Sequence, residues 1–166
     1  TVRRPFTPRR VLLVGSCERA KAIGARLVQR GARVEVAPNC HQGLVEIERL
    51  GGPSVFDALG IILPAYKTER PWTTPPEVWQ ERRTEALVGP FQLLRAYAPH
   101  RESGTIFGVT VMGGGLGFEN VVQGAPEGGG LLGLLKAVRR EHASLVVQAL
   151  DISPSSPGDQ VADALF

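Results

Sequence analysis

The 166-residue sequence has few of the residues from which disulfide, metal and nucleic-acid sites are built. Its two cysteines and three histidines give neither a disulfide framework nor the ligand spacing of a zinc site, so we expect no metal ion. Aromatic residues make up only 6% of the chain, and the arginines behind its net charge of +3 are scattered. Because a nucleic-acid surface usually combines a basic stripe with aromatic side chains, we expect no nucleic-acid partner.

Long apolar segments are missing as well. No run approaches the length of about 18 residues that a membrane-spanning helix needs, so we expect no membrane partner. The first ten residues contain arginines but not the apolar stretch of a signal peptide. The sequence therefore predicts a cytoplasmic protein.

The hydrophobic content of 43% over 166 residues is enough for one buried core. Residues 1–9, rich in proline and arginine, are interpreted as a linker, and a helical pattern has just started at residues 162–166. Both ends resemble cut points. We therefore expect one degenerate Rossmann-like domain over residues 10–166, as a fragment of a larger multienzyme.

Apolar strand patterns alternate with helical patterns along this domain. Five strands separated by crossover helices predict a parallel sheet covered on both faces, with right-handed crossovers. The prediction is thus a doubly wound, five-stranded parallel α/β sheet, a Rossmann-like or flavodoxin-like three-layer sandwich, with strand order 2-1-3-4-5. A ligand would be expected at the carboxyl ends of strands one and three, near Gly15, Ser16 and Pro64. The strands are predicted at residues 10–15, 33–37, 57–63, 105–111 and 145–152, and the helices at 18–30, 39–50, 74–97 and 127–142.

Several helix ends carry local signals. Asn39 and Gln42 form a capping pattern, and Gly31 and Gly51 follow the last periodic residues of two helices. Pro90 lies inside the long third helix, where a kink is expected.

The first strand-to-helix turn lacks most of the dinucleotide-binding fingerprint. Its sequence is Gly15-Ser16-Cys17-Glu18-Arg19-Ala20, so one glycine remains and Glu18 brings negative charge to the place of a phosphate. The second strand ends without an acidic residue for a ribose hydroxyl. Gly15 and Ser16 are therefore only weak candidates for cofactor binding.

A second glycine cluster, at residues 113–117, follows the fourth strand, and a third occupies residues 128–130. Gly113, Gly114 and Gly115 are the further weak candidates for a cofactor site. Chain mobility or close packing of a helix on the sheet is the favoured interpretation of these glycines.

Nucleophilic catalysis finds no support in the sequence. There is no Gly-x-Ser-x-Gly elbow, and the three histidines, His41, His100 and His142, fall at predicted helix ends without a companion acid and hydroxyl. Cys17 is interpreted as a structural cysteine because Glu18 beside it opposes a reactive thiolate. We predict no catalytic residue.

One segment carries a family resemblance. The run Pro126-Glu127-Gly128-Gly129-Gly130-Leu131-Leu132-Gly133-Leu134-Leu135-Lys136-Ala137-Val138-Arg139-Arg140-Glu141-His142, followed by Leu150-Asp151, resembles the non-catalytic structural half of the ketoreductase region in type I polyketide synthases and polyunsaturated fatty acid synthases. Residues 104–152 carry most of the likeness, and residues 10–63 fit by architecture only.

Both halves of such a region are related to short-chain dehydrogenase/reductases, whose active members carry Tyr-x-x-x-Lys on this helix. Here the same spacing gives Leu132 and Lys136, so a hydrocarbon replaces the proton donor. Thr110 stands near the place of the family's catalytic serine. The resemblance therefore implies a degenerate reductase fold.

The implied role is architectural: no cofactor is bound by this chain, and NADPH is expected in a downstream catalytic half that reduces β-ketoacyl chains on acyl carrier protein. That half and other synthase domains would be its direct partners, and acyl carrier protein an indirect one. Two alternatives stay open. One is a nucleotide- or small-ligand-binding domain that uses the Gly113–Gly117 loop; the other is a flavodoxin-like interaction module that binds through residues 72–79, with Trp72 and Trp79 as anchors.

Overall fold

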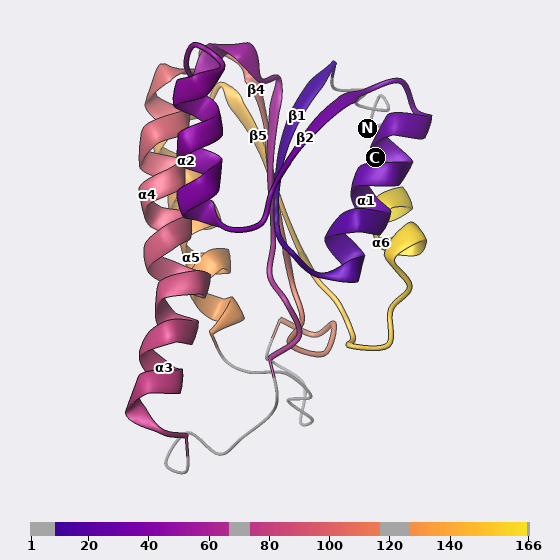
Figure 1. Ribbon diagram of the computed structural model, residues 1–166, viewed down its shortest axis with the longest axis vertical. Coiled ribbons are helices and arrows are strands. Elements are labelled where there is room, and N and C mark those ends of the chain that lie inside the picture. The colour runs from indigo at the N-terminus through magenta and orange to yellow at the C-terminus, as the bar shows by residue number, and fades with distance from the viewer. Residues whose placement is uncertain (1–8, 67–73, 117–126, 166) are drawn as a thin grey trace.

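The computed structural model describes residues 9–66, 74–116 and 127–165, and it contains a five-stranded parallel sheet (Figure 1). The strand order is β2-β1-β3-β4-β5, which confirms the predicted order and fold class. The strands are β1 (Arg10–Val14), β2 (Arg33–Ala37), β3 (Ala58–Ile62), β4 (Gly104–Thr110) and β5 (Leu145–Asp151). The α-helices are α1 (Glu18–Gln29), α2 (Cys40–Arg49), α3 (Pro76–Arg83), α4 (Gly89–Tyr97), α5 (Gly128–Glu141) and α6 (Gly158–Leu165).

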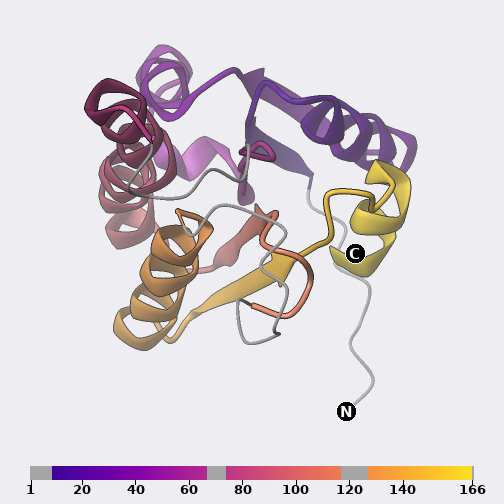
Figure 2. The ribbon, with the colours of Figure 1, turned by 90° about the horizontal axis from the view of Figure 1, so that it is seen from below.

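The sheet is the middle of three layers. Helices α2, α4 and α5 cover one face and α1 and α6 the other, as Figures 1 and 2 show from two directions. Alternate residues of β1 serve the two cores: Leu12 and Val14 face the α2 side, and Val11 and Leu13 face the α1 side. Because the three inner strands are apolar on both faces, they read as continuous hydrophobic runs in the sequence.

The helix ends follow their sequence signals. The Asn39 side-chain oxygen accepts a hydrogen bond of 2.9 Å from the Gln42 amide, so the predicted amino-terminal cap of α2 is confirmed. Gly31 and Gly51 take positive φ values of 89° and 94° just beyond α1 and α2, where a residue with a side chain would be strained.

The long third helix is continuous but not regular. A π-helical turn, Thr84–Val88, joins α3 to α4, and Pro90 lies in the first turn of α4. Proline has no N–H, so Pro90 cannot donate to the carbonyl of Ala86 four residues earlier. The expected irregularity is therefore found one turn before the proline, as a widened turn of the helix.

Close contacts between neighbouring strands depend on glycine. A Cβ atom at Gly60 would lie 2.3 Å from the ring of Phe107, because that ring packs directly over the β3 backbone. Larger residues at position 60 would displace Phe107 from the core on the α1 side of the sheet.

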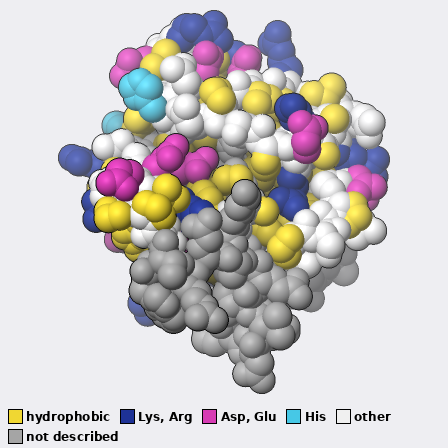
Figure 3. Space-filling model, turned by 60° about the horizontal axis from the view of Figure 1, so that its bottom comes forward, with side chains coloured by type: hydrophobic (Ala, Val, Ile, Leu, Met, Phe, Trp, Pro, Cys, Tyr) yellow, Lys and Arg dark blue, Asp and Glu magenta, His cyan; other side chains and the backbone are white. Residues whose placement is uncertain are grey.

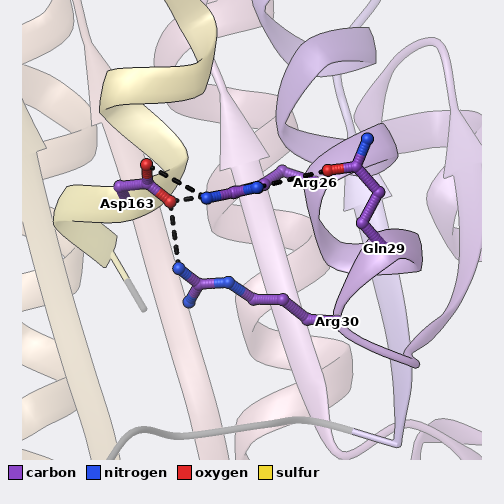
Figure 4. Close-up of polar contacts among 4 residues, drawn as sticks. All are labelled: Arg26, Gln29, Arg30 and Asp163. Atoms are coloured by element: carbon purple, nitrogen blue, oxygen red, sulfur yellow. Dashed lines mark hydrogen bonds and ion pairs between the residues drawn. The ribbon is translucent and has the colours of Figure 1, made fainter.

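Helix α6 is held against α1 by Asp163 (Figure 4). The Arg26 guanidinium donates from Nε and Nη2 to the two carboxylate oxygens, at 2.9 and 3.3 Å. Arg30 adds a third bond of 2.9 Å. The apolar side of α6 meanwhile buries Val161 and Leu165 in the α1-side core.

Candidate functional site

A pocket of about 730 Å³ lies at the carboxyl ends of β1 and β3, where the direction of chain winding reverses. The strand order predicted from the sequence places an expected ligand at this position. Gly15 lines the pocket, whereas Ser16 and Pro64 do not. The remaining walls come from the start of α2 and from the helical run α3 to α4.

The charge of this pocket is negative. Glu77, Glu81 and Glu85 line it at four-residue intervals along the α3 side, and no lysine or arginine is among the lining residues that the structure describes. Figure 3 shows acidic side chains beside hydrophobic ones at this end of the molecule. Such a wall repels the pyrophosphate of a dinucleotide and favours a neutral or cationic molecule with an apolar body.

Cys40, which lines the pocket, and Tyr66, which contacts the lining residue Glu85, are both held in their neutral forms. Burial, and then the charge of Glu85, raises the pKa of the Cys40 thiol to about 12. The Tyr66 hydroxyl donates to Glu85 at 2.9 Å, and burial followed by the same carboxylate raises the pKa of Tyr66 well above its usual value. Neither group can supply an anionic nucleophile near neutral pH.

The first turn is built for close packing rather than for phosphate. A Cβ atom at Gly15 would lie 2.7 Å from the Ile62 carbonyl oxygen, so the glycine lets the turn approach β3. Ser16 is exposed and forms no cap of α1. The Glu18 carboxylate lies at the amino end of α1, as expected, and pairs there with Lys21 at 2.5 Å.

The glycine loop after β4 is held by an aspartate of the neighbouring strand. Oδ1 of Asp151, at the end of β5, accepts bonds from the Thr110 hydroxyl at 3.0 Å and the Met112 amide at 2.7 Å. Its Oδ2 accepts bonds of 2.9 Å from the amides of Gly114 and Leu116. Asp151 is only 7% exposed.

This arrangement bears on the candidates Gly113, Gly114 and Gly115. Backbone N–H groups in a glycine loop can cradle a phosphate. Here the Gly114 amide already donates to the Asp151 carboxylate, and the Gly113 amide donates to the Ile152 carbonyl. To bind the Gly114 amide, an incoming phosphate would have to displace the Asp151 carboxylate. Gly117, the last residue of the predicted loop, lies outside the described residues.

Thr110 is likewise engaged. It is fully buried, and its hydroxyl donates to Asp151 instead of facing the pocket. Leu132 and Lys136, at the spacing of the family's tyrosine and lysine, lie on α5 beside β5 and line a second, smaller pocket there. The structure therefore does not bring Thr110, Leu132 and Lys136 together in the pocket at the carboxyl ends of β1 and β3.

A buried ionic contact joins α3 to the start of α5. Arg82 lies 3.8 Å from a carboxylate oxygen of Glu127 and stacks over the Tyr66 ring at 5.8 Å from its centre. The Glu127 side chain is only 4% exposed. These residues bridge separate elements, and no sequence pattern singled them out because their partners are far apart in the chain.

The three histidines lie apart from one another. His41 is exposed and lines the pocket at the start of α2, His100 is exposed, and His142 is half-buried at the end of α5. Within residues 9–66, 74–116 and 127–165, no three His, Cys, Asp or Glu side chains gather closely enough to hold a metal ion. The helices of the same residues are all too short or too polar to cross a membrane. Trp79 is partly exposed on α3, whereas Trp72 lies outside the described residues.

Comparison with known proteins identifies the fold. No family model matches the chain, and no curated protein does. Among solved structures, it is similar to a bulky-bulky ketone specific alcohol dehydrogenase from Comamonas testosteroni, with a TM-score of 0.76 and 15% identity over 96% of this chain and 82% of that one. It is also similar to a carbonyl reductase from Pseudomonas aeruginosa in complex with NADP, with a TM-score of 0.70 and 15% identity over 95% of this chain and 88% of that one.

A short chain dehydrogenase from Mycobacterium smegmatis is also similar, with a TM-score of 0.68 and 15% identity over 95% of this chain and 83% of that one. Likeness at such low identity shows the fold alone. The chain has the fold of the short-chain dehydrogenase/reductases.

Proposed function

We propose that this chain is the non-catalytic structural half of a synthase ketoreductase region, in the cytoplasm. It supports a downstream catalytic half that binds NADPH and reduces β-ketoacyl chains on acyl carrier protein in polyketide or fatty acid biosynthesis. The observation that carries the proposal is the Asp151 carboxylate inside the glycine loop of a reductase fold. The Met112, Gly114 and Leu116 amides are bonded to this carboxylate, so they are not available to cradle the phosphate of a cofactor.

Other features support the same role. Leu132 has no proton to give a substrate carbonyl, and the glutamates of the pocket repel a dinucleotide. The short-chain dehydrogenase fold is thus retained without its chemistry. Such a unit contributes surface and stability to the larger protein.

The test is production of the chain alone and together with the segment encoded after residue 166. Alone, it should bind no NADPH in calorimetry at micromolar concentrations and reduce no β-ketoacyl thioester surrogate. Together with its neighbour it should melt at a higher temperature, because a partner that binds only the folded state stabilises it. Turnover by the isolated chain that Lys136→Ala abolishes, or no affinity for the neighbouring segment, would overturn the proposal.

The pocket favours a second function, the binding of a small ligand by an α/β domain. Its volume of about 730 Å³ suits a small organic molecule. Its apolar floor and glutamate wall predict a neutral or cationic ligand rather than a nucleotide. Saturable binding of such a compound, weakened by Glu81→Gln and unchanged by Glu141→Gln on α5, would favour this function over the structural one.

A further inference from the structure

The two edges of the sheet differ in how they are protected. Edge strand β2 is five residues long, and its Arg33 and Glu35 place charges along it; Glu35 pairs with Arg10 of β1 at 3.2 Å. Edge strand β5 has seven residues, Leu-Val-Val-Gln-Ala-Leu-Asp, with no charge before the final, buried Asp151. Exposed sheet edges are normally shortened, charged or covered, because a long uncharged edge pairs with other strands. Edge β5 is neither short nor charged.

The backbone of β5 offers hydrogen-bonding groups on its open side. Ile152 donates to the Thr110 carbonyl and accepts from the Gly113 amide, so the backbone groups of residue 152 face β4. The direction of the backbone N–H and C=O groups alternates along a strand. The backbone groups of Gln148 and Leu150 therefore also face β4, whereas those of Val147 and Ala149 point outward. Strand β5 pairs only with β4 among the described strands, which leaves those outward groups without a strand partner.

A groove of about 360 Å³ runs along this edge. Residues 147–150 of β5 form its floor, α5 walls one side, and Ala164 and Leu165 of α6 wall the other. On the α5 side it is basic, because Lys136 and Arg139 line it and neither forms an ion pair with a described residue. The α6 side is apolar. No acidic side chain is among the described residues that line the groove.

We propose that the β5 edge is a docking site for an extended strand of the catalytic half, whose alternate side chains are acidic toward α5 and apolar toward α6. The inference rests on the proposed function for the origin of that strand. Backbone hydrogen bonds to Val147 and Ala149 supply affinity, and the side chains supply specificity, as in other cases of strand addition to a sheet. Lys136 and Arg139, which form no ion pair within the described part of the chain, gain carboxylate partners.

Charge argues against a second copy of this chain as the occupant. Two copies joined antiparallel through their β5 edges would continue one sheet, with their α5 helices on the same face. Lys136 and Arg139 of each copy would then approach those of the other, and like charges repel. An acidic strand fits the same groove without that repulsion.

The first arm of the test uses the full chain and a synthetic ten-residue peptide in which valine alternates with glutamate. Hydrogen exchange followed by NMR should show slower exchange of the Val147 and Ala149 amides on binding, and unchanged exchange at Gln148 and Leu150. The double variant Lys136→Glu/Arg139→Glu should weaken binding at least tenfold. The matched control is Arg140→Glu, on the same helix but outside the groove, and it should change affinity less than twofold. A peptide with lysine in place of glutamate should bind at least tenfold more weakly.

The second arm applies the same variants to the chain produced with its catalytic half. A complex that loses affinity with Lys136→Glu/Arg139→Glu and protects Val147 and Ala149 supports the inference. A stable complex that shows neither effect overturns the edge site and leaves the proposed function standing. Peptide binding at β5 without any affinity for the neighbouring segment overturns the proposed function and the origin of the strand. Equal binding of the acidic and basic peptides, or dimers of the chain joined through β5, overturns the charge argument.

Discussion

Asp151 and Asp163 each fasten together segments that are distant in the sequence, but they do so in opposite surroundings. Asp151 is 7% exposed and accepts four hydrogen bonds, three of them from backbone amides. The Asp163 side chain is 48% exposed and accepts its bonds from two arginines at the surface (Figure 4). A buried acceptor is costly to remove because its donors lose their partner away from water, whereas water and salt replace a surface pair. Burial therefore decides, more than the number of hydrogen bonds, how much each aspartate contributes to stability.

The largest effect is expected from Asp151→Ala. The Thr110 hydroxyl and the Met112 amide are buried and would lose their acceptor, which should lower the free energy of unfolding by roughly 3 kcal/mol. Urea unfolding followed by circular dichroism measures the loss. Asp159→Ala, at an exposed carboxylate of α6, is the control and should have a much smaller effect.

Asp151→Asn sharpens the same prediction. The amide keeps one acceptor oxygen for one pair of donors and turns an NH₂ group toward the other pair. We expect a free energy of unfolding between those of the wild type and Asp151→Ala, and faster exchange of the loop amides than in the wild type. A variant as stable as the wild type would show that the carboxylate is dispensable.

A smaller effect is expected from Thr110→Val, which removes one donor to Asp151 and preserves the side-chain shape. Asp151 keeps its three amide donors, so we expect a loss of about 1 kcal/mol in the free energy of unfolding. Thr105→Val, at another buried threonine of β4, is the matched control. If both variants lose the same stability, the Thr110 hydroxyl has no special role.

The smallest effect is expected from Asp163→Asn. Hydrogen bonds from Arg26 and the charges of Arg26 and Arg30 lower the pKa of Asp163 below its ordinary value of 3.8. The ionised carboxylate therefore stabilises the fold above the unfolded-state pKa, and this contribution is lost as the pH falls through the lower folded-state pKa. The melting temperature of the variant should lie slightly below that of the wild type at pH 7 and low salt. Because the pair is exposed, 1 M NaCl should remove the difference, and a difference that persists would contradict the surface interpretation.

The sequence predicted the architecture well because its signals are local. Continuous apolar runs mark the inner strands, Asn39 marks a helix start, and the alternation of elements gives the strand order. The short helix α6 begins at Gly158, earlier than the pattern at residues 162–166 indicates, and Val161 in its first turn packs into the core. For Pro90 the sequence predicts a kink, and the structure has a π-helical turn just before this residue.

The candidate site was harder to predict because its decisive contacts are long-range. In the sequence Asp151 belongs to the Leu150-Asp151 pair and Gly114 to a glycine run, but nothing local links two residues 37 positions apart. One signal was available: adjacent parallel strands bring their carboxyl ends together, so an acidic residue at the end of β5 faces the loop that follows β4. Similarly, the glutamates at positions 77, 81 and 85 could have been read as one side of the pocket from their four-residue spacing.

The bonds of Asp151 also fix an order of events during folding. They span 35 to 41 residues of sequence, and α5 lies between their ends. The amides of Gly114 and Leu116 acquire this acceptor only when the chain through Asp151 has been synthesised and β5 has docked on β4. Before that, ordering the glycine loop would cost conformational entropy without these bonds to offset it, so the loop has little to hold it in place. We therefore expect residues 112–116 to become ordered late in folding, and to be unformed in a ribosome-bound chain that stops short of β5.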